Sequence, residues 1–261
     1  MRAWLLAITV VGAVRPAAAQ PKIGLIDFYG ERKTSSDRVL KAAGVKVGDP
    51  LPPSKLDIEE RIEALPNVVR AHVEAACCTA GGGAVLYLGI EERGAPHFPF
   101  RVAAEYSEEA RADAPALLGD APATQETVEA LQMAAQDPDP VVRAAAVRGL
   151  VRISATPGLQ VLPTWIVEML NSVVYSDRQA AVEALLKLTE SGDAVLIGKI
   201  RETGFDSLVQ MARWKHLPHA LPPYLLLCRI AGIGEAEAQS TWSVGERDKI
   251  VARIVKSAKR K

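Results

Sequence analysis

The sequence predicts a two-part protein: a small α+β domain with the element order β-α-α-β-β, followed by an all-α domain of repeated helices. Strand-like segments flank two short helix patterns between Lys22 and Glu92, which predicts the first part. Helix patterns rich in alanine and leucine recur after residue 123, which predicts the second. A length of 261 residues, with 49% hydrophobic and 24% charged residues, fits two ordinary globular domains.

The charge balance argues against polyanionic partners. The chain has 31 basic and 31 acidic residues and a formal net charge of zero, so we expect no nucleic acid partner. The basic residues Lys256, Lys259, Arg260 and Lys261 gather at the C-terminus, where cations complement a helix dipole. Membrane contact is therefore expected to be peripheral at most.

Residues 1–19 have the three parts of a secretory signal peptide. Arg2 is followed by an apolar run from Leu5 to Val14, and the segment closes on Ala17-Ala18-Ala19. The run is too short to span a hydrocarbon core of about 30 Å. We expect a mature protein that begins at or near Gln20, is periplasmic or secreted, and has no transmembrane anchor. The alternative is an N-terminal core helix.

The first module, residues 22–92, is predicted from its alternation and breakers. A strand over Lys22–Phe28 precedes a helix that follows the caps of Thr34–Asp37 and ends at Gly44. A second helix, with its apolar stripe on Leu56, Ile58, Ile62 and Leu65, stops at Pro66. Val69, Ala71, Val73 and Ala75 are expected on the buried side of the next strand, opposite Val68, Arg70, His72 and Glu74. Gly81-Gly82-Gly83 then turns the chain into a last strand that ends at Glu91-Glu92.

Three stretches of this module resemble a POTRA domain: "IGLIDFYGERKTSSDRVLKAAGVKVGDPL", "IEALPNVVRAHVEA" and "GGGAVLYLGIEE". The resemblance covers about 70 residues and rests on the order of the motifs. It implies a periplasmic module that binds polypeptides, often by pairing on an exposed strand edge. The strand after Pro66 would lie at that edge. No series of alternating strands follows, so a complete outer-membrane pore is excluded.

Residues 93–122 are predicted to be a linker. Prolines and glycines such as Pro96, Pro99 and Gly119 interrupt the segment, and it has no firm apolar stripe. A short helix is expected near Glu105 to Leu118. We interpret the segment as a connector that lets the modules move, with packing onto the helical domain as the alternative.

The second module, residues 123–258, contains a repeat. "AAVRGLVRI" from Ala145 and "AAVEALLKL" from Ala180 lie about 35 residues apart, a period typical of stacked helical hairpins. A weaker third copy is expected from Pro222. Further helices are expected at the following ranges: 124–136, 163–174, 193–203, 205–215 and 244–258.

"DPDPVVRAAAVRGLVRI", from Asp137 to Ile153, resembles the inner helix of a HEAT repeat. The resemblance implies an elongated protein-binding array in which each repeat contacts its neighbours. It also implies that Arg143 braces the turn of its repeat, with Asp137 or Asp139 as its partner. Trp165, Trp214 and Trp242 are expected to pack in the core or between repeats.

Cysteines and histidines are the residues that could form disulfides, bind a metal or take part in catalysis. For Cys77-Cys78 the sequence leaves open inert packing, a vicinal or intermolecular disulfide, a disulfide to Cys228, and a metal site with His72. His216-x-x-His219 is interrupted by Pro218 and has no evident third ligand. Glu91 and Glu92 are neighbours on a strand and face opposite ways, so joint acid–base work is not expected. No catalytic residue, metal, cofactor or small-molecule substrate is therefore predicted.

We thus expect a periplasmic protein-binding scaffold or adaptor of the cell envelope, with a role in outer-membrane protein assembly. Its partners would be proteins that bind the strand edge, the helical groove or both. The candidate partner-binding residues are Val68, Arg70, His72 and Glu74 on the edge strand. The alternative function is an envelope enzyme, or an accessory subunit, that uses the cysteines or histidines.

Overall fold

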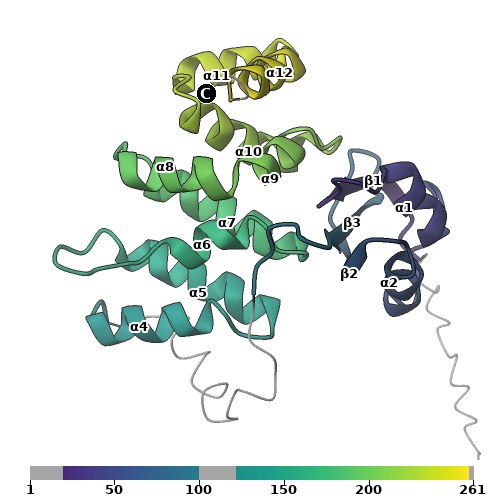
Figure 1. Cartoon of the computed structure of the whole chain (residues 1–261), viewed down its shortest axis with the longest axis horizontal. Helices are drawn as coiled ribbons and strands as arrows, with labels where there is room; N and C mark the ends of the chain where they lie inside the picture. Colours follow the sequence, from purple (N-terminus) through teal and green to yellow (C-terminus); the bar gives the residue numbers. More distant parts are fainter. Residues whose placement is uncertain (1–19, 100–121, 259–261) are drawn as a thin grey trace, which may run out of the picture.

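The computed structural model describes residues 20–99 and 122–258 of the chain. The predicted signal peptide, the predicted helix near 105–118 and the last three residues lie outside the described residues. Figure 1 shows the helices stacked in chain order from α4 to α12, with the sheet module beside the middle of the stack. Within the described ranges, no helix is long and apolar enough to cross a membrane.

The first module has the predicted order of elements: β1 (Ile23–Tyr29), α1 (Ser36–Ala43), α2 (Leu56–Glu63), β2 (Val68–Ala76) and β3 (Ala84–Glu92). The strands form one mixed sheet in the order β1-β3-β2, with β1 parallel and β2 antiparallel to β3. Gly44 ends α1 in the left-handed conformation, as its place after the apolar stripe predicts. Gly83 permits the close approach of the turn to β1, because a Cβ there would lie 2.7 Å from the Cα of Gly24.

One face of the sheet packs on α1 and α2 through aliphatic side chains. The buried members of this core are Ile23, Ile26, Val39, Ala43, Ile58, Ile62, Val68, Ala71, Val73, Leu86, Leu88 and Ile90. Three details of the predicted pattern are wrong. Ala75, which the alternation assigns to the buried side of its strand, is exposed. Leu56 is 68% exposed, and a register shift between Val68 and Arg70 turns Val69 outward and buries Val68.

The helical module consists of α4 (Gln125–Ala134), α5 (Pro140–Ile153), α6 (Thr164–Met169), α7 (Tyr175–Leu188), α8 (Ala194–Thr203), α9 (Phe205–Ala212), α10 (Leu217–Ile230), α11 (Glu235–Ser243) and α12 (Arg247–Ala258). The repeated segments are α5 and α7, which pack on each other. Leu150 and Ile153 are buried as their spacing predicts.

Two predicted helix bounds are wrong, and one helix was not predicted. The helix expected at 163–174 ends at Met169, and α7 begins at Tyr175 after a short turn. The helix expected from Pro222 begins at Leu217, because Pro218 stands in its first turn, where a missing N–H costs no helical hydrogen bond. The sequence pattern did not predict α11.

The sheet and the helical module α4–α12, which we call the array, share a continuous buried cluster. It joins Tyr29, Val85, Tyr87 and Phe98 to residues from α4 through α12. Phe98 belongs to the described start of the predicted linker and is 2% exposed. This packing argues against modules that move freely and favours the alternative, in which the start of the connector packs onto the array.

Candidate functional site

The predicted partner-binding residues lie on β2, which is an edge strand as the resemblance implied. Their environments differ. Arg70 is exposed, His72 and Glu74 are half-buried, and Val68 is buried in the aliphatic core. Val69, which the alternation placed inward, is 52% exposed and lies on the outer part of the edge.

The edge of β2 is shielded by two carboxylates from α2. The backbone N–H of Ala71 donates to Glu63 Oε1 at 2.8 Å, and that of Val73 donates to Glu59 Oε1 at 2.7 Å. Glu59 and Glu63 are one helical turn apart, and their acceptors match two outward N–H groups of an extended strand. These side chains therefore stand where the carbonyl groups of a neighbouring strand would be.

His72 and Glu74 of β2 also make internal contacts. The His72 ring lies 3.3 Å from Glu59 Oε1 and 3.7 Å from Glu74 Oε2. Burial lowers the pKa of His72, and the two glutamates partly offset that effect. Glu74 Oε2 also accepts from the backbone N–H and the hydroxyl of Ser176, at 3.2 and 3.3 Å. Glu74 thus fastens β2 to the start of α7.

The other face of the sheet meets the array at a seam of polar and aromatic side chains. Asp27 of β1 accepts the backbone N–H groups of Lys215 (2.9 Å) and His216 (3.0 Å). Tyr29 donates to the carbonyl of Val173 at 2.8 Å. Gly89 makes room for the Tyr29 ring, because a Cβ at position 89 would lie 2.3 Å from it.

The aromatic rings of the seam come from both modules. Tyr87 of β3 stacks on Tyr175 of α7 with ring centroids 3.9 Å apart, and Trp214 packs against both rings. Trp214 is 3% exposed and donates its indole N–H to the carbonyl of Phe28. The prediction that Trp214 is a packing residue is confirmed, although it packs between the modules. Trp165 and Trp242 are half-buried against the same cluster.

Two histidines lie at the seam where α10 begins: His216 is its N-cap residue and His219 stands in its first turn. Their rings are 4.0 Å apart in an edge-to-face arrangement. His219 Nδ1 bonds the Tyr87 hydroxyl at 2.6 Å, and His216 Nε2 bonds the Cys78 carbonyl at 3.2 Å. Burial, with a smaller effect of His216, lowers the pKa of His219 to about 4. Pro218 stands in the first turn of α10, where proline is tolerated, so the predicted interruption of the helix is wrong.

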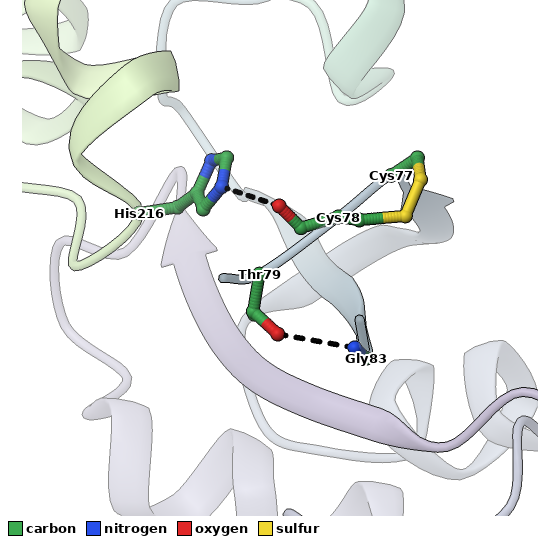
Figure 2. The surroundings of a disulfide bond; sticks show 5 residues. All are labelled: Cys77, Cys78, Thr79, Gly83 and His216. Carbon is green, nitrogen blue, oxygen red and sulfur yellow. Dashed lines mark hydrogen bonds between the residues drawn. A yellow bond between two sulfur atoms is a disulfide. The ribbon is translucent and has the colours of Figure 1, made fainter. Parts of the chain in front are cut away.

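Cys77 and Cys78 are joined in a disulfide, as one of the open alternatives had it. The strand β2 ends at Ala76, so both cysteines lie in the following turn, where neighbouring side chains need not point to opposite faces. Figure 2 shows the disulfide on the outer side of this turn and the Cys78 carbonyl directed toward His216. Cys228 is buried and free, and burial raises the pKa of its thiol.

Glu92, the last residue of β3, organises the loop between β1 and α1. Its carboxylate accepts the backbone N–H groups of Arg32, Lys33 and Thr34 at 2.8–3.1 Å. Burial opposes ionisation, but these donors outweigh it and lower the pKa of Glu92. The role of Glu92 is therefore structural: it holds the loop between β1 and α1 against the end of β3.

Arg143 braces its repeat, but its carboxylate partner differs from the prediction. It donates to the carbonyls of Asp137 and Pro138 at 2.6 and 2.9 Å, and pairs with Asp177 of α7 at 2.9 and 2.8 Å. Neither the Asp137 nor the Asp139 carboxylate is that partner. Arg178 holds the corresponding place in the next repeat, where its guanidinium lies 4.5 Å from the centre of the Tyr29 ring.

Hollows of the array lie near its C-terminal end. One of about 380 Å³ lies between α9, α10 and α12, with Phe205, Ile230, Ile254, Arg201 and Arg253 among its lining residues. Another of about 350 Å³ lies beside α7 and α10. Among the described residues, no group of three or more histidine, cysteine, aspartate or glutamate side chains is placed to hold a metal ion.

Comparison with known proteins finds a match to the first part of the helical module. A family model for HEAT repeats matches residues 101–186, which include α4 to α6 and most of α7. The chain therefore carries HEAT-like repeats, which generally act as protein-interaction scaffolds. No curated protein and no solved structure matches the chain.

The seam is the feature that sequence reasoning missed. Its signal was the run Ala84–Ile90, in which Val85 and Tyr87 stand where a strand with one solvent-exposed face would have charged or small polar residues. A strand buried on both faces has such a continuous run, whereas a strand with one wet face alternates. The residues Val85 to Ile90 are indeed all buried.

Proposed function

We propose that this chain is an exported protein-binding scaffold of the cell envelope, with a role in outer-membrane protein assembly. In this proposal the first module is POTRA-like and the HEAT-like array holds it in a fixed orientation. The edge strand β2 receives an extended segment of the partner. The fold supports protein partners and this binding mode, and no catalytic step is part of the proposal.

The observation that carries the proposal is the edge position of β2 in a sheet held against a HEAT-like array. A strand at a sheet edge has backbone groups that another chain can pair with. Glu59 and Glu63 occupy two of the outward donors, and they can be displaced because side chains rotate and backbone does not. Until a partner displaces them, these two carboxylates prevent the edge from pairing with unrelated strands.

Support for a binding role over an enzymatic one comes from what the reactive side chains do. His219 bonds Tyr87, His216 bonds the Cys78 carbonyl, and Cys228 is buried within the array. These groups contribute to packing and to contacts between the modules. The alternative of an envelope enzyme would need at least one of them to face a substrate.

A photo-crosslinking residue placed at Val69 tests the proposal in intact cells. Val69 lies on the β2 edge and is 52% exposed, and Val195 of α8, which is 83% exposed, is a matched control. We expect a discrete crosslinked protein from position 69 that is absent from position 195. Equal crosslinking at the two positions, or adducts at Val195 alone, would contradict docking at β2.

Export is tested on the same cells by determining the N-terminus of the protein. We expect the mature chain to begin at or near Gln20 and to fractionate with the periplasm or the medium. An intact Met1 on protein in the cytoplasm would overturn this part of the proposal. The docking of a partner at β2 is tested separately by the crosslinking experiment.

A further inference from the structure

The Cys77–Cys78 disulfide lies where a reductant can reach it. Both cysteines are exposed, in the turn that joins β2 to β3. Exchange begins with attack of a thiolate on a disulfide sulfur, so access to the sulfur governs it. Cys228 differs in every respect, since it is buried in α10 and free. The chain thus carries one accessible disulfide and one protected thiol.

The same turn holds a buried histidine. The Cys78 carbonyl bonds His216 Nε2 at 3.2 Å, and His216 is 7% exposed. The other ring nitrogen, Nδ1, is buried and has no hydrogen-bond partner among the described residues. A neutral imidazole has one donor and one acceptor nitrogen, so the Cys78 carbonyl sets which nitrogen of His216 carries the proton.

His216 connects this turn to the seam. It is the N-cap residue of α10, and its backbone N–H donates to Asp27 of β1. Its ring packs on His219, which bonds Tyr87 of β3. A shift of the Cys78 carbonyl therefore affects the contact between the sheet and α10 through the side chain of His216.

We propose that Cys77–Cys78 is a thiol–disulfide exchange site whose redox state controls the contact between the sheet and the start of α10. The disulfide closes a small ring that includes the peptide bond between the two cysteines, and this ring fixes the Cys78 carbonyl toward His216. Reduction opens the ring and frees that carbonyl. The His216 ring then has no fixed hydrogen-bond partner, and the seam loosens where α10 begins.

The co-reactant is a dithiol. One of its thiolates attacks a sulfur of the disulfide, the S–S bond breaks, and the other cysteine leaves as a thiolate that takes up a proton. The second thiol of the reductant attacks the mixed disulfide and releases the first cysteine. The protein gains two electrons and two protons, and the reductant becomes a disulfide. This inference goes beyond the proposed function and does not depend on a partner.

The first measurement is the thiol state of the full chain, purified without reductant and alkylated after denaturation. We expect alkylation of Cys228 alone and a peptide with Cys77 and Cys78 lighter by two hydrogens than the dithiol. Alkylation of both neighbouring cysteines in untreated protein would overturn the proposal. A covalent dimer on a non-reducing gel that is lost in the Cys77→Ser variant would also overturn it.

The second measurement is amide hydrogen exchange of the native protein before and after treatment with dithiothreitol. We expect exchange at residues 216–220 to become several-fold faster on reduction, while α5 and α7 stay unchanged. The Cys228→Ser variant should respond as the natural chain does. The Cys77→Ser/Cys78→Ser variant should show the faster exchange in both conditions. Unchanged exchange at 216–220 after complete reduction would overturn the control of the seam.

Discussion

The two faces of the central sheet are built from different side chains. The face toward α1 and α2 is aliphatic, with Leu86, Leu88 and Ile90 packed on the two helices. The face toward the array carries Asp27, Tyr29 and Tyr87, whose polar groups bond the array. The aliphatic face makes the module fold, because burial of apolar area is favourable in any orientation. The polar face fixes the orientation of the module, because hydrogen bonds require a set geometry.

The largest effect is expected on the aliphatic face. Leu88 is fully buried between β3 and the two helices. Leu88→Ala removes the packed side chain and leaves a cavity, so the free energy of unfolding should fall by about 2–5 kcal/mol. Urea unfolding followed by circular dichroism measures this loss. A change as small as that at an exposed position would mean that the aliphatic face is not the core of the module.

A somewhat smaller and more local effect is expected at Asp27. Its removal in Asp27→Ala leaves the N–H groups of Lys215 and His216 without their acceptors. An unsatisfied buried donor costs about 1–3 kcal/mol, and the amides at 215 and 216 should exchange faster. Asp206→Ala is the control, because Asp206 forms an exposed pair with Arg32 that is worth about 0–1 kcal/mol. Equal losses in the two variants would contradict the role of the seam.

The shield of β2 is expected to contribute less. Glu63→Ala removes the acceptor of the Ala71 N–H and should cost about 0.5–1.5 kcal/mol, with faster amide exchange at Ala71. Glu63→Gln keeps an oxygen acceptor and should protect Ala71 as the natural residue does. Glu60→Ala changes an exposed glutamate of the same helix and serves as the control. Protection of Ala71 that survives Glu63→Ala would show that the edge is covered in another way.

The smallest effect is a dependence on pH from His219. Its folded pKa of about 4 lies below the ordinary 6.5, so the unfolded chain takes up this proton first as the pH falls. The contribution of neutral His219 to the free energy of unfolding is complete above pH 6.5 and decreases as the pH falls toward 4. Because the ring is only half-buried, solvent screening reduces its size.

His219→Asn is the variant that isolates this contribution. The amide oxygen of asparagine can accept from Tyr87 and does not titrate. Its unfolding free energy should fall less steeply than that of the natural chain between about pH 5 and 7. His72, whose pKa is also lowered, contributes in the same direction in both proteins. Parallel pH profiles would exclude His219 as a source of the dependence.

The sequence predicted the elements better than the contact between modules. Alternation in β2 and β3 and the breakers at Gly44 and Pro66 are local signals, and the structure has the predicted β-α-α-β-β order. The bulge at Val68–Arg70 was not predicted, because one inserted residue leaves the apolar content of the strand unchanged. The sequence pattern predicts a start of α10 that is too late, because proline usually interrupts a helix, whereas Pro218 stands in the first turn of α10.

The candidate site was predicted in position and not in detail. The place of β2 at the edge followed from the resemblance, and its shield did not, because Glu59 and Glu63 look like ordinary solvated residues of an amphipathic helix. The pair of Arg143 with Asp177 joins two repeats, whereas the sequence pointed to aspartates beside it. Contacts between residues far apart in the chain have no periodicity that a single sequence reveals.

The most direct test of the account is whether the sheet and the array tumble as one body. Backbone ¹⁵N relaxation of the full chain gives a rotational correlation time for the amides of β1–β3 and another for those of α7–α10. The contacts of Asp27, Tyr29 and Glu74 with the array predict the same correlation time for both sets. A clearly shorter correlation time for the sheet would contradict the account, because it would show that the modules move independently.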